Sequence, residues 1–178
     1  AKARAVAARR PDAVVIGSDQ VAWSGARRYG KPGTRDAAIA QLLELSGEKV
    51  TFDTALCVID PRNGTLHEAV VPTDVVFRTL SKTEIERYVD LDDPVDCAGA
   101  AKSESLGIAL LERLSGDDPT ALVGLPLIEL SRMLRRLGWH ESAIYHEGTR
   151  DYPFLLMGTK EAFASDNARM KGYAEEEP

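Results

Sequence analysis

An acidic and an amide side chain stand next to each other at Asp19 and Gln20, within the stretch VVIGSDQVAW (residues 14–23). A run of β-branched residues precedes them, so residues 13–18 are predicted to form a buried strand with the pair at its end. A carboxylate there can bind a metal ion or accept a proton from water, and a carboxamide can donate and accept hydrogen bonds at once. The alternative interpretation is that Ser18 and Asp19 only cap a turn, through hydrogen bonds to the nearby backbone.

Three cationic side chains are further candidates for substrate binding. Lys31 lies in the glycine-flanked loop YGKP, where an ammonium suits a phosphate oxygen, although it could also be a solvated loop lysine. Lys102 precedes Glu104 by two residues and is expected either to pair with that acid or to reach phosphate. Arg78 ends a predicted strand, where it would clamp phosphate or pair with an acid on a neighbouring element, and we favour the ion pair.

The elements that must position these side chains include both helices and strands. Capping and stop signals predict a helix from Thr34 to Gly47, a short helix after the capping box Ser81/Glu84, and an amphipathic helix with Pro126 near its first turn and Gly138 as its stop. Period-two patterns predict strands over 49–60 and 65–79, joined by a turn at Asp60–Gly64 as a hairpin. Residues 92–105 are predicted to form a polar loop.

Composition narrows the possible functions. The chain has 178 residues, 44% hydrophobic and 28% charged, which suits one globular domain or one with an appendage. The net charge of −6 provides no broad basic surface for nucleic acid. No apolar run approaches the ~18 residues of a membrane span. Cys57 and Cys97 lie far apart and are expected to be reduced thiols in a cytoplasmic protein.

Six segments in register resemble the Maf family of nucleotide pyrophosphatases over residues 1–138. They are GSDQV, GKP, LLELSG, TDVVFRTLSKTEIERYV, DCAGAAKSES and VGLPLIELSRML. The AGAAKSE form resembles the branch that hydrolyses 7-methyl-GTP rather than the branch acting on dTTP and UTP. The resemblance implies an α/β fold like that of Maf and inosine triphosphatases, with a long twisted mixed sheet, flanking helices and a cleft between two lobes. The implied reaction releases a nucleoside monophosphate and pyrophosphate.

The resemblance also implies a role for each site residue. Asp19 would be the proton acceptor and a ligand of a divalent Mg or Mn ion, and Lys31 and Lys2 would face the phosphates. Gln20 and Glu104 would determine base specificity, since a carboxylate is attracted to the positively charged 7-methylguanine ring. The implied partners are the nucleoside triphosphate and a second copy of the chain, in a cytoplasmic homodimer that binds neither nucleic acid nor membrane.

Two departures from the family leave an alternative open. The family begins with a strand and a Ser-x-Ser-Pro-x-Arg phosphate loop about 50 residues before residue 1, so we expect an N-terminally truncated chain. Residues 139–178 match nothing in the family and form a tail of unknown role, although a strand-then-helix pattern from Tyr152 could take the place of the first strand. The alternative function is therefore an inactive remnant that binds nucleotide weakly or only dimerises.

Overall fold

A computed structural model describes residues 2–138, 140–145 and 154–158 of the chain. The chain divides into two compact units, Ala1–Glu129 and Leu130–Pro178. All seven predicted site residues lie in the first unit, so this unit alone forms the candidate site. The division expected after residue 138 stays a prediction. Among the described residues, no helix is both long enough and apolar enough to cross a membrane.

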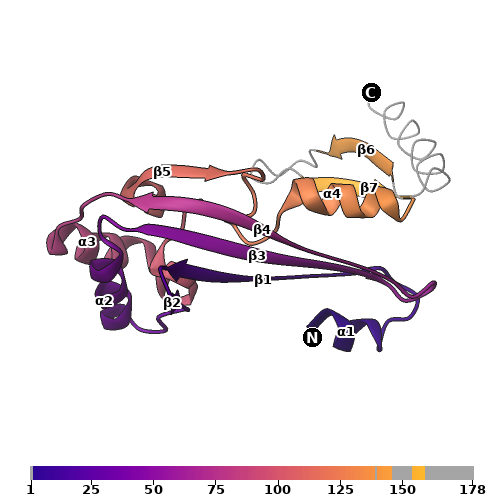
Figure 1. The fold of residues 1–178 in the computed structure, drawn as a ribbon, viewed down its shortest axis with the longest axis horizontal. Helices are drawn as coiled ribbons and strands as arrows, with labels where there is room; N and C mark the ends of the chain where they lie inside the picture. The colour runs from indigo at the N-terminus through magenta and orange to yellow at the C-terminus, as the bar shows by residue number, and fades with distance from the viewer. Residues whose placement is uncertain (1, 139, 146–153, 159–178) are drawn as a thin grey trace, which may run out of the picture. The chain divides into compact units, whose positions relative to one another are not determined.

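The first unit is a mixed α/β structure built on one five-stranded sheet with the order β2-β1-β3-β4-β5 (Figure 1). The strands are β1 (Val15–Ser24), β2 (Arg27–Tyr29), β3 (Lys49–Asp60), β4 (Thr65–Phe77) and β5 (Leu111–Gly116). The strand pairs in the described part of the chain are all antiparallel. The parallel pair that a mixed sheet requires is therefore not found among these residues.

The two central strands form the hairpin that the sequence predicts. β3 and β4 pair in continuous register from Lys49 opposite Val76 to Asp60 opposite Thr65. The turn is closed by the Asp60 carboxylate, which accepts hydrogen bonds from both Nε and Nη2 of Arg62 at 2.8 Å. Gly64 completes the turn at φ 73°, a conformation that glycine adopts without steric cost. Local turn chemistry thus fixes the register of the long hairpin.

Alternate residues of β3 point into the core, as the two-residue period of a strand requires. The buried set runs along one face of the strand and consists of Val50, Phe52, Thr54, Leu56, Val58 and, at the turn, Asp60. Asp60 pairs with Arg62 in the turn, and Thr54 is the single polar residue between Val50 and Val58. Its hydroxyl must find partners inside the protein.

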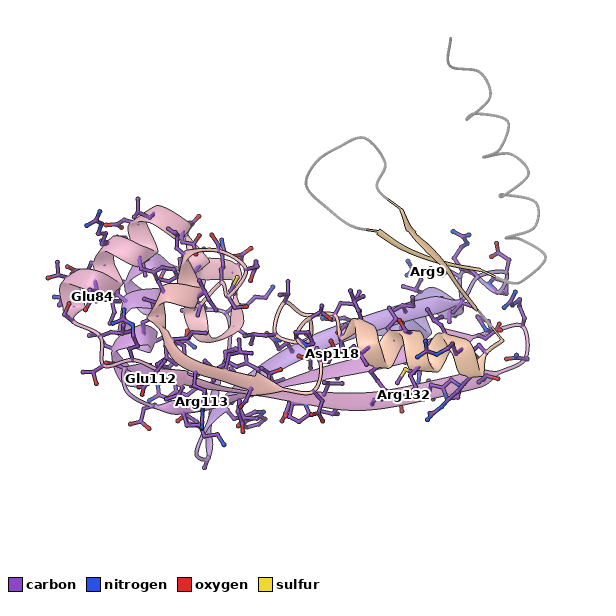
Figure 2. All side chains as sticks on the ribbon, turned by 90° about the horizontal axis from the view of Figure 1, so that it is seen from above. Arg9, Glu84, Glu112, Arg113, Asp118 and Arg132 are labelled. Atoms are coloured by element: carbon purple, nitrogen blue, oxygen red, sulfur yellow. The ribbon has the colours of Figure 1, made fainter. Side chains whose placement is uncertain are left out.

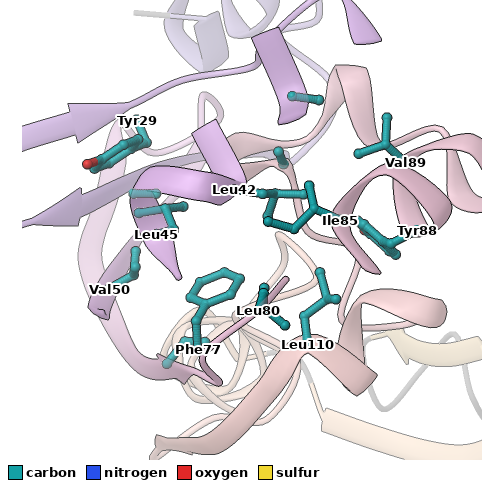
Figure 3. Packing of buried hydrophobic residues seen from close by; sticks show 14 of the residues in the cluster. Tyr29, Leu42, Leu45, Val50, Phe77, Leu80, Ile85, Tyr88, Val89 and Leu110 are labelled. Atoms are coloured by element: carbon teal, nitrogen blue, oxygen red, sulfur yellow. The ribbon is translucent and has the colours of Figure 1, made fainter. Parts of the chain in front are cut away.

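Two capped helices pack against one end of the sheet. Helix α2 (Arg35–Leu45) begins after Thr34, whose hydroxyl accepts a hydrogen bond from Ala37 N. Helix α3 (Lys82–Asp92) begins with the predicted capping box of Ser81 and Glu84. The two helices and the strand ends share one apolar cluster, shown in Figure 3, which includes Leu42, Leu45, Val50, Phe77, Ile85 and Leu110.

The segment predicted as a polar loop contains two short 3₁₀ turns, and a third follows it. These are η1 (Pro94–Asp96) and η2 (Ala98–Ala100), followed by η3 (Leu106–Leu110). Gly99 has φ 73°, and a Cβ on it would lie 2.8 Å from Phe52 Cζ. Because a larger residue would collide there, the glycine allows η2 to approach the sheet closely.

A buried carboxylate binds the first turn of helix α4 (Leu127–Arg136). Asp118 is 2% exposed and accepts hydrogen bonds through Oδ2 from Ile128 N and Glu129 N, at 2.7 and 3.2 Å (Figure 2). Its other oxygen accepts from Thr120 Oγ1 and Thr120 N. The helix ends shortly before Gly138, at φ 82°, as predicted.

The second unit also contains a two-stranded sheet. Strands β6 (His140–Tyr145) and β7 (Phe154–Gly158) pair antiparallel. The tail pattern from Tyr152 thus includes a strand, whose partner is β6. The helix expected after it lies outside the described residues.

Candidate active site

Asp19 lies inside strand β1 and not past its end. The strand runs from Val15 to Ser24, and Asp19 is directly opposite Ala55 of β3. The predicted end at residue 18 was therefore wrong, as was the alternative that Ser18 and Asp19 cap a turn. Gly17, Ser18 and the two polar residues interrupt the β-branched run, but pairing with β3 keeps the strand extended through them.

Asp19 forms an ion pair with Lys2, which brings two predicted site residues together. Lys2 Nζ donates to Asp19 Oδ2 at 3.2 Å, and the two side chains are 82% and 69% exposed. This hydrogen bond is the main cause that lowers the pKa of Asp19; Gln20 N and the charge of Lys31 act in the same direction, and partial burial opposes them. The carboxylate is therefore ionised at neutral pH and able to accept a proton.

Helix α1 (Lys2–Ala7) can hold Lys2 there because it packs closely on β1. A Cβ on Gly17 would lie 2.8 Å from the Cβ of Ala3, so this position leaves room for nothing larger. Ala3 and Ala7 are buried in a small apolar cluster with Val15 of β1, against which Cys57 of β3 packs. The small residues of the helix and of Gly17 thus place Lys2 beside Asp19.

A hollow of about 660 Å³ opens beside this ion pair. Its wall combines Lys2, Arg4, Asp19 and Glu68 with the small or apolar residues Ala3, Gly17, Ala55, Leu56, Ala69 and Val70, and also contains Ser18 and Cys57. The size suits a small-molecule ligand. Two cations and two carboxylates within a partly apolar wall are a set of groups able to bind a charged molecule.

Lys31 lies in the loop after β2 and is exposed. Gly33 N donates to Val95 O at 2.8 Å, and Gln41 Nε2 donates to Gly30 O at 3.2 Å, so both sides of the lysine are tied to neighbouring elements. Its charge acts on the pKa of Asp19. Lys2 and Lys31 therefore act on one carboxylate from two different elements.

Gln20 points to the opposite face of the sheet from Asp19, because adjacent residues of a strand alternate. Its Nε2 lies 2.9 Å from Thr54 Oγ1, 3.0 Å from Ala121 O and 3.1 Å from Leu122 O. The two residues still share an accessible edge, since β2 pairs only with residues 22–24 of β1 and no described strand flanks residues 15–21 on that side.

Lys102 is engaged away from Asp19. Its Nζ donates at 2.8 Å to the carbonyl oxygens of both Asp92 and Asp93, at the end of α3. Ser105 Oγ donates to Asp92 Oδ1 at 2.6 Å, so the segment that carries Glu104 is held at both ends. Glu104 itself is exposed and raises the pKa of Cys97 by its charge, although burial is the main cause of that shift.

Arg78 forms the ion pair that we favoured. Its Nη2 lies 3.5 Å from Glu84 Oε1, and its Nε donates to Ala109 O at 2.9 Å.

Neither cysteine is activated as a nucleophile. Burial is the main cause that raises the pKa of Cys57 and raises that of Cys97 to about 11, with Asp96 adding to the second shift. Both remain protonated thiols at neutral pH.

Comparison with known proteins identifies the family of the chain. A family profile described as "Maf-like protein" matches residues 1–137. The chain belongs to the Maf family. Among similar proteins, the 7-methyl-GTP pyrophosphatase of Aromatoleum aromaticum is 63% identical over 137 residues, covering 77% of this chain and 71% of the relative. Those of Cupriavidus pinatubonensis and Cupriavidus metallidurans are 54% and 52% identical over 138 residues, covering 78% of this chain and 69% of each relative.

Sequence reasoning missed two residues that support the candidate site. Thr54 supports Gln20, and Asp118 anchors the segment that leads into α4. A signal existed for Thr54, because it is the polar residue among the apolar alternate positions from Val50 to Val58 of β3. Asp118 had a weaker signal, an acid shortly before a predicted helix start.

Proposed function

We propose that this protein hydrolyses 7-methyl-GTP to the nucleoside monophosphate and pyrophosphate. The observation that carries the proposal is 52–63% identity to three 7-methyl-GTP pyrophosphatases over 77–78% of the chain. The family profile matches residues 1–137, which include all seven candidate site residues. The proposed fold is correspondingly that of the Maf and inosine triphosphatase type, with the nucleotide in a cleft between two lobes.

In the proposed reaction, water attacks phosphorus and the bond between the α- and β-phosphates breaks. Asp19 accepts the proton that the attacking water loses, and its lowered pKa keeps it ionised for this task. Lys2 and Lys31 offset the negative charge of the phosphates, as phosphoryl transfer requires. When the substrate binds, the ammonium of Lys2 would contact a phosphate oxygen in addition to Asp19.

A divalent Mg or Mn ion fits this site with the substrate present. Mg²⁺ in phosphate-handling sites is commonly held by one or two carboxylates together with phosphate oxygens and water. Asp19 offers one exposed carboxylate, and within the described residues no cluster of three acidic, histidine or cysteine side chains forms a cage. Asp19 would therefore hold the ion jointly with the phosphates. The ion would supply further compensation of negative charge.

We assign base selection to Gln20, on the face of the sheet opposite Asp19, and to Glu104, in the loop after α3. Glu104 provides a negative charge for the cationic 7-methylguanine ring, and Gln20 provides a hydrogen-bonding group. The contacts of Lys102 and Arg78 within the protein support structural roles for both rather than phosphate binding. We also propose a homodimer in the cytoplasm, following the family resemblance.

The test is a substrate panel with the protein expressed from its complete reading frame. 7-Methyl-GTP, GTP, dTTP and UTP are incubated with Mg²⁺, and the monophosphate and pyrophosphate are quantified by chromatography. We expect 7-methyl-GTP to give the highest kcat/KM. Preference for dTTP or UTP would assign the protein to the other branch of the family, and binding without turnover would support the inactive remnant.

A further inference from the structure

Thr54 is a buried threonine directly opposite Gln20. The two are cross-strand partners in the β1–β3 register, and Thr54 is fully buried, at 0% exposure. Its Oγ1 accepts a hydrogen bond from Gln20 Nε2 and donates one to Ala121 O, both at 2.9 Å. The hydroxyl therefore links the Gln20 amide to the backbone at Ala121.

The surroundings of the amide allow only one orientation. Three acceptors, including two backbone carbonyl oxygens, surround Nε2 within 3.1 Å, whereas an amide nitrogen carries two hydrogens. A flipped amide would place Oε1 against the carbonyl oxygens of residues 121 and 122, which repel it. Both donors are used inside the protein, so a ligand meets Gln20 through Oε1, an acceptor.

We propose that Thr54 is a positioning residue that holds Gln20 with Oε1 toward the nucleobase, and so selects bases that present donors there. This inference rests on the proposed function for the identity of the ligand. Guanine, methylated or not, offers N1–H and an exocyclic amine, which match an acceptor. Adenine carries an unprotonated N1 at the corresponding position, and an acceptor opposite it is unfavourable.

Three variants separate this role from simple packing. Thr54→Val removes the hydroxyl and keeps the shape, and Thr54→Ser keeps the hydroxyl. Thr73→Val is the matched control on β4, because Thr73 is also buried, at 1% exposure, and its Oγ1 has no hydrogen-bond partner among the described residues. The same three changes are made in the Gln20→Ala background to form a double-mutant cycle.

The first readout is binding selectivity. Calorimetry measures the Kd of the non-hydrolysable α,β-methylene analogues of 7-methyl-GTP and ATP. In Thr54→Val we expect the preference for the guanine analogue to fall about five- to tenfold, the factor of one hydrogen bond between uncharged groups. Thr54→Ser and Thr73→Val should keep the preference. In the Gln20→Ala background, Thr54→Val should have no further effect on it.

The second readout is solvent exchange of the Gln20 side-chain NH₂ in NMR spectra, which does not depend on catalysis. We expect slow exchange in the wild type and Thr73→Val, and faster exchange in Thr54→Val. Equal selectivity in Thr54→Val and Thr73→Val, or equal loss in Thr54→Val and Thr54→Ser, would overturn the proposal. Absence of 7-methyl-GTP hydrolysis by the wild type, with the expected selectivity and exchange, would instead refute the proposed function alone.

Discussion

At the scale of single residues, Asp19 and Gln20 are neighbours in sequence that belong to separate networks. Asp19 is joined to Lys2 on the face that carries α1, and Gln20 is joined to Thr54 on the other face. The first network keeps the Asp19 carboxylate ionised, and the second fixes the orientation of the Gln20 amide. Their shared edge of β1 is where one ligand could meet both.

Replacing Lys2 with Met should raise the pKa of Asp19 toward its ordinary value. The Lys2 hydrogen bond lowers this pKa, so the ion pair is present above the folded-state pKa and is lost as the pH falls through it. A ¹³C NMR titration of the Asp19 carboxyl measures the shift. The control is Arg10→Met, which removes the cation of a separate exposed pair with Asp12. An unchanged Asp19 titration in Lys2→Met would contradict the ion pair.

Replacing Glu104 with Gln should reduce the preference for 7-methyl-GTP over GTP more than it reduces the overall rate. The change removes a negative charge and keeps the shape, so the lost attraction to the methylated ring should cost about tenfold in the kcat/KM ratio. Glu112→Gln, an exposed acid on β5 labelled in Figure 2, serves as control. If both substrates slow equally, Glu104 does not recognise the methylated base.

At the scale of elements, the parts predicted well from sequence are those determined by local chemistry. The turn Asp60–Gly64 and the box Ser81/Glu84 involve residues within five positions of each other. The extent of β1 was missed because pairing with β3, and not β-branched residues, holds positions 17–20 extended. The partners of Gln20 and Lys102 were also missed, since they come from segments that only the folded chain brings near.

Asp118→Ala should lower the free energy of unfolding by about 2–4 kcal/mol. The substitution removes a buried carboxylate that caps the helix and accepts hydrogen bonds from the partly buried N–H groups of Ile128 and Glu129. Urea unfolding measures the effect. The adjacent exposed residue gives the control Asp117→Ala, expected to change stability by less than about 0.5 kcal/mol. Similar values for the two variants would show that Asp118 does not anchor α4.

Lys102→Met should destabilise the loop after α3 and leave phosphate binding in place. Losing the two hydrogen bonds to the carbonyls of Asp92 and Asp93 should lower the free energy of unfolding by about 1–3 kcal/mol. The control is Lys82→Met, which removes an exposed ion pair with Glu86 on the helix surface and should change stability little. Thermal unfolding and kcat/KM for both guanine substrates are measured together. A uniform loss of kcat/KM with unchanged stability would return Lys102 to a phosphate-binding role.

At the scale of the whole molecule, family membership was predictable because six short segments occur in register over residues 1–138. The matched profile covers nearly the same range, residues 1–137. The expected mixed sheet depended on a parallel strand partner, and the described strands supply only antiparallel ones. A short turn such as Asp60–Gly64 identifies an antiparallel pair, but the pairing of strands joined by longer connections is not readable from residue patterns.

The central claim is that Asp19 accepts the proton in hydrolysis of 7-methyl-GTP. Its most direct test is kcat/KM for pyrophosphate release by Asp19→Asn, expressed from the complete reading frame, beside the wild type. The account predicts a ~10²–10⁴-fold loss, the usual contribution of a general base, with unchanged thermal unfolding because the side chain is 69% exposed. Turnover of 7-methyl-GTP near the wild-type rate in Asp19→Asn would contradict it.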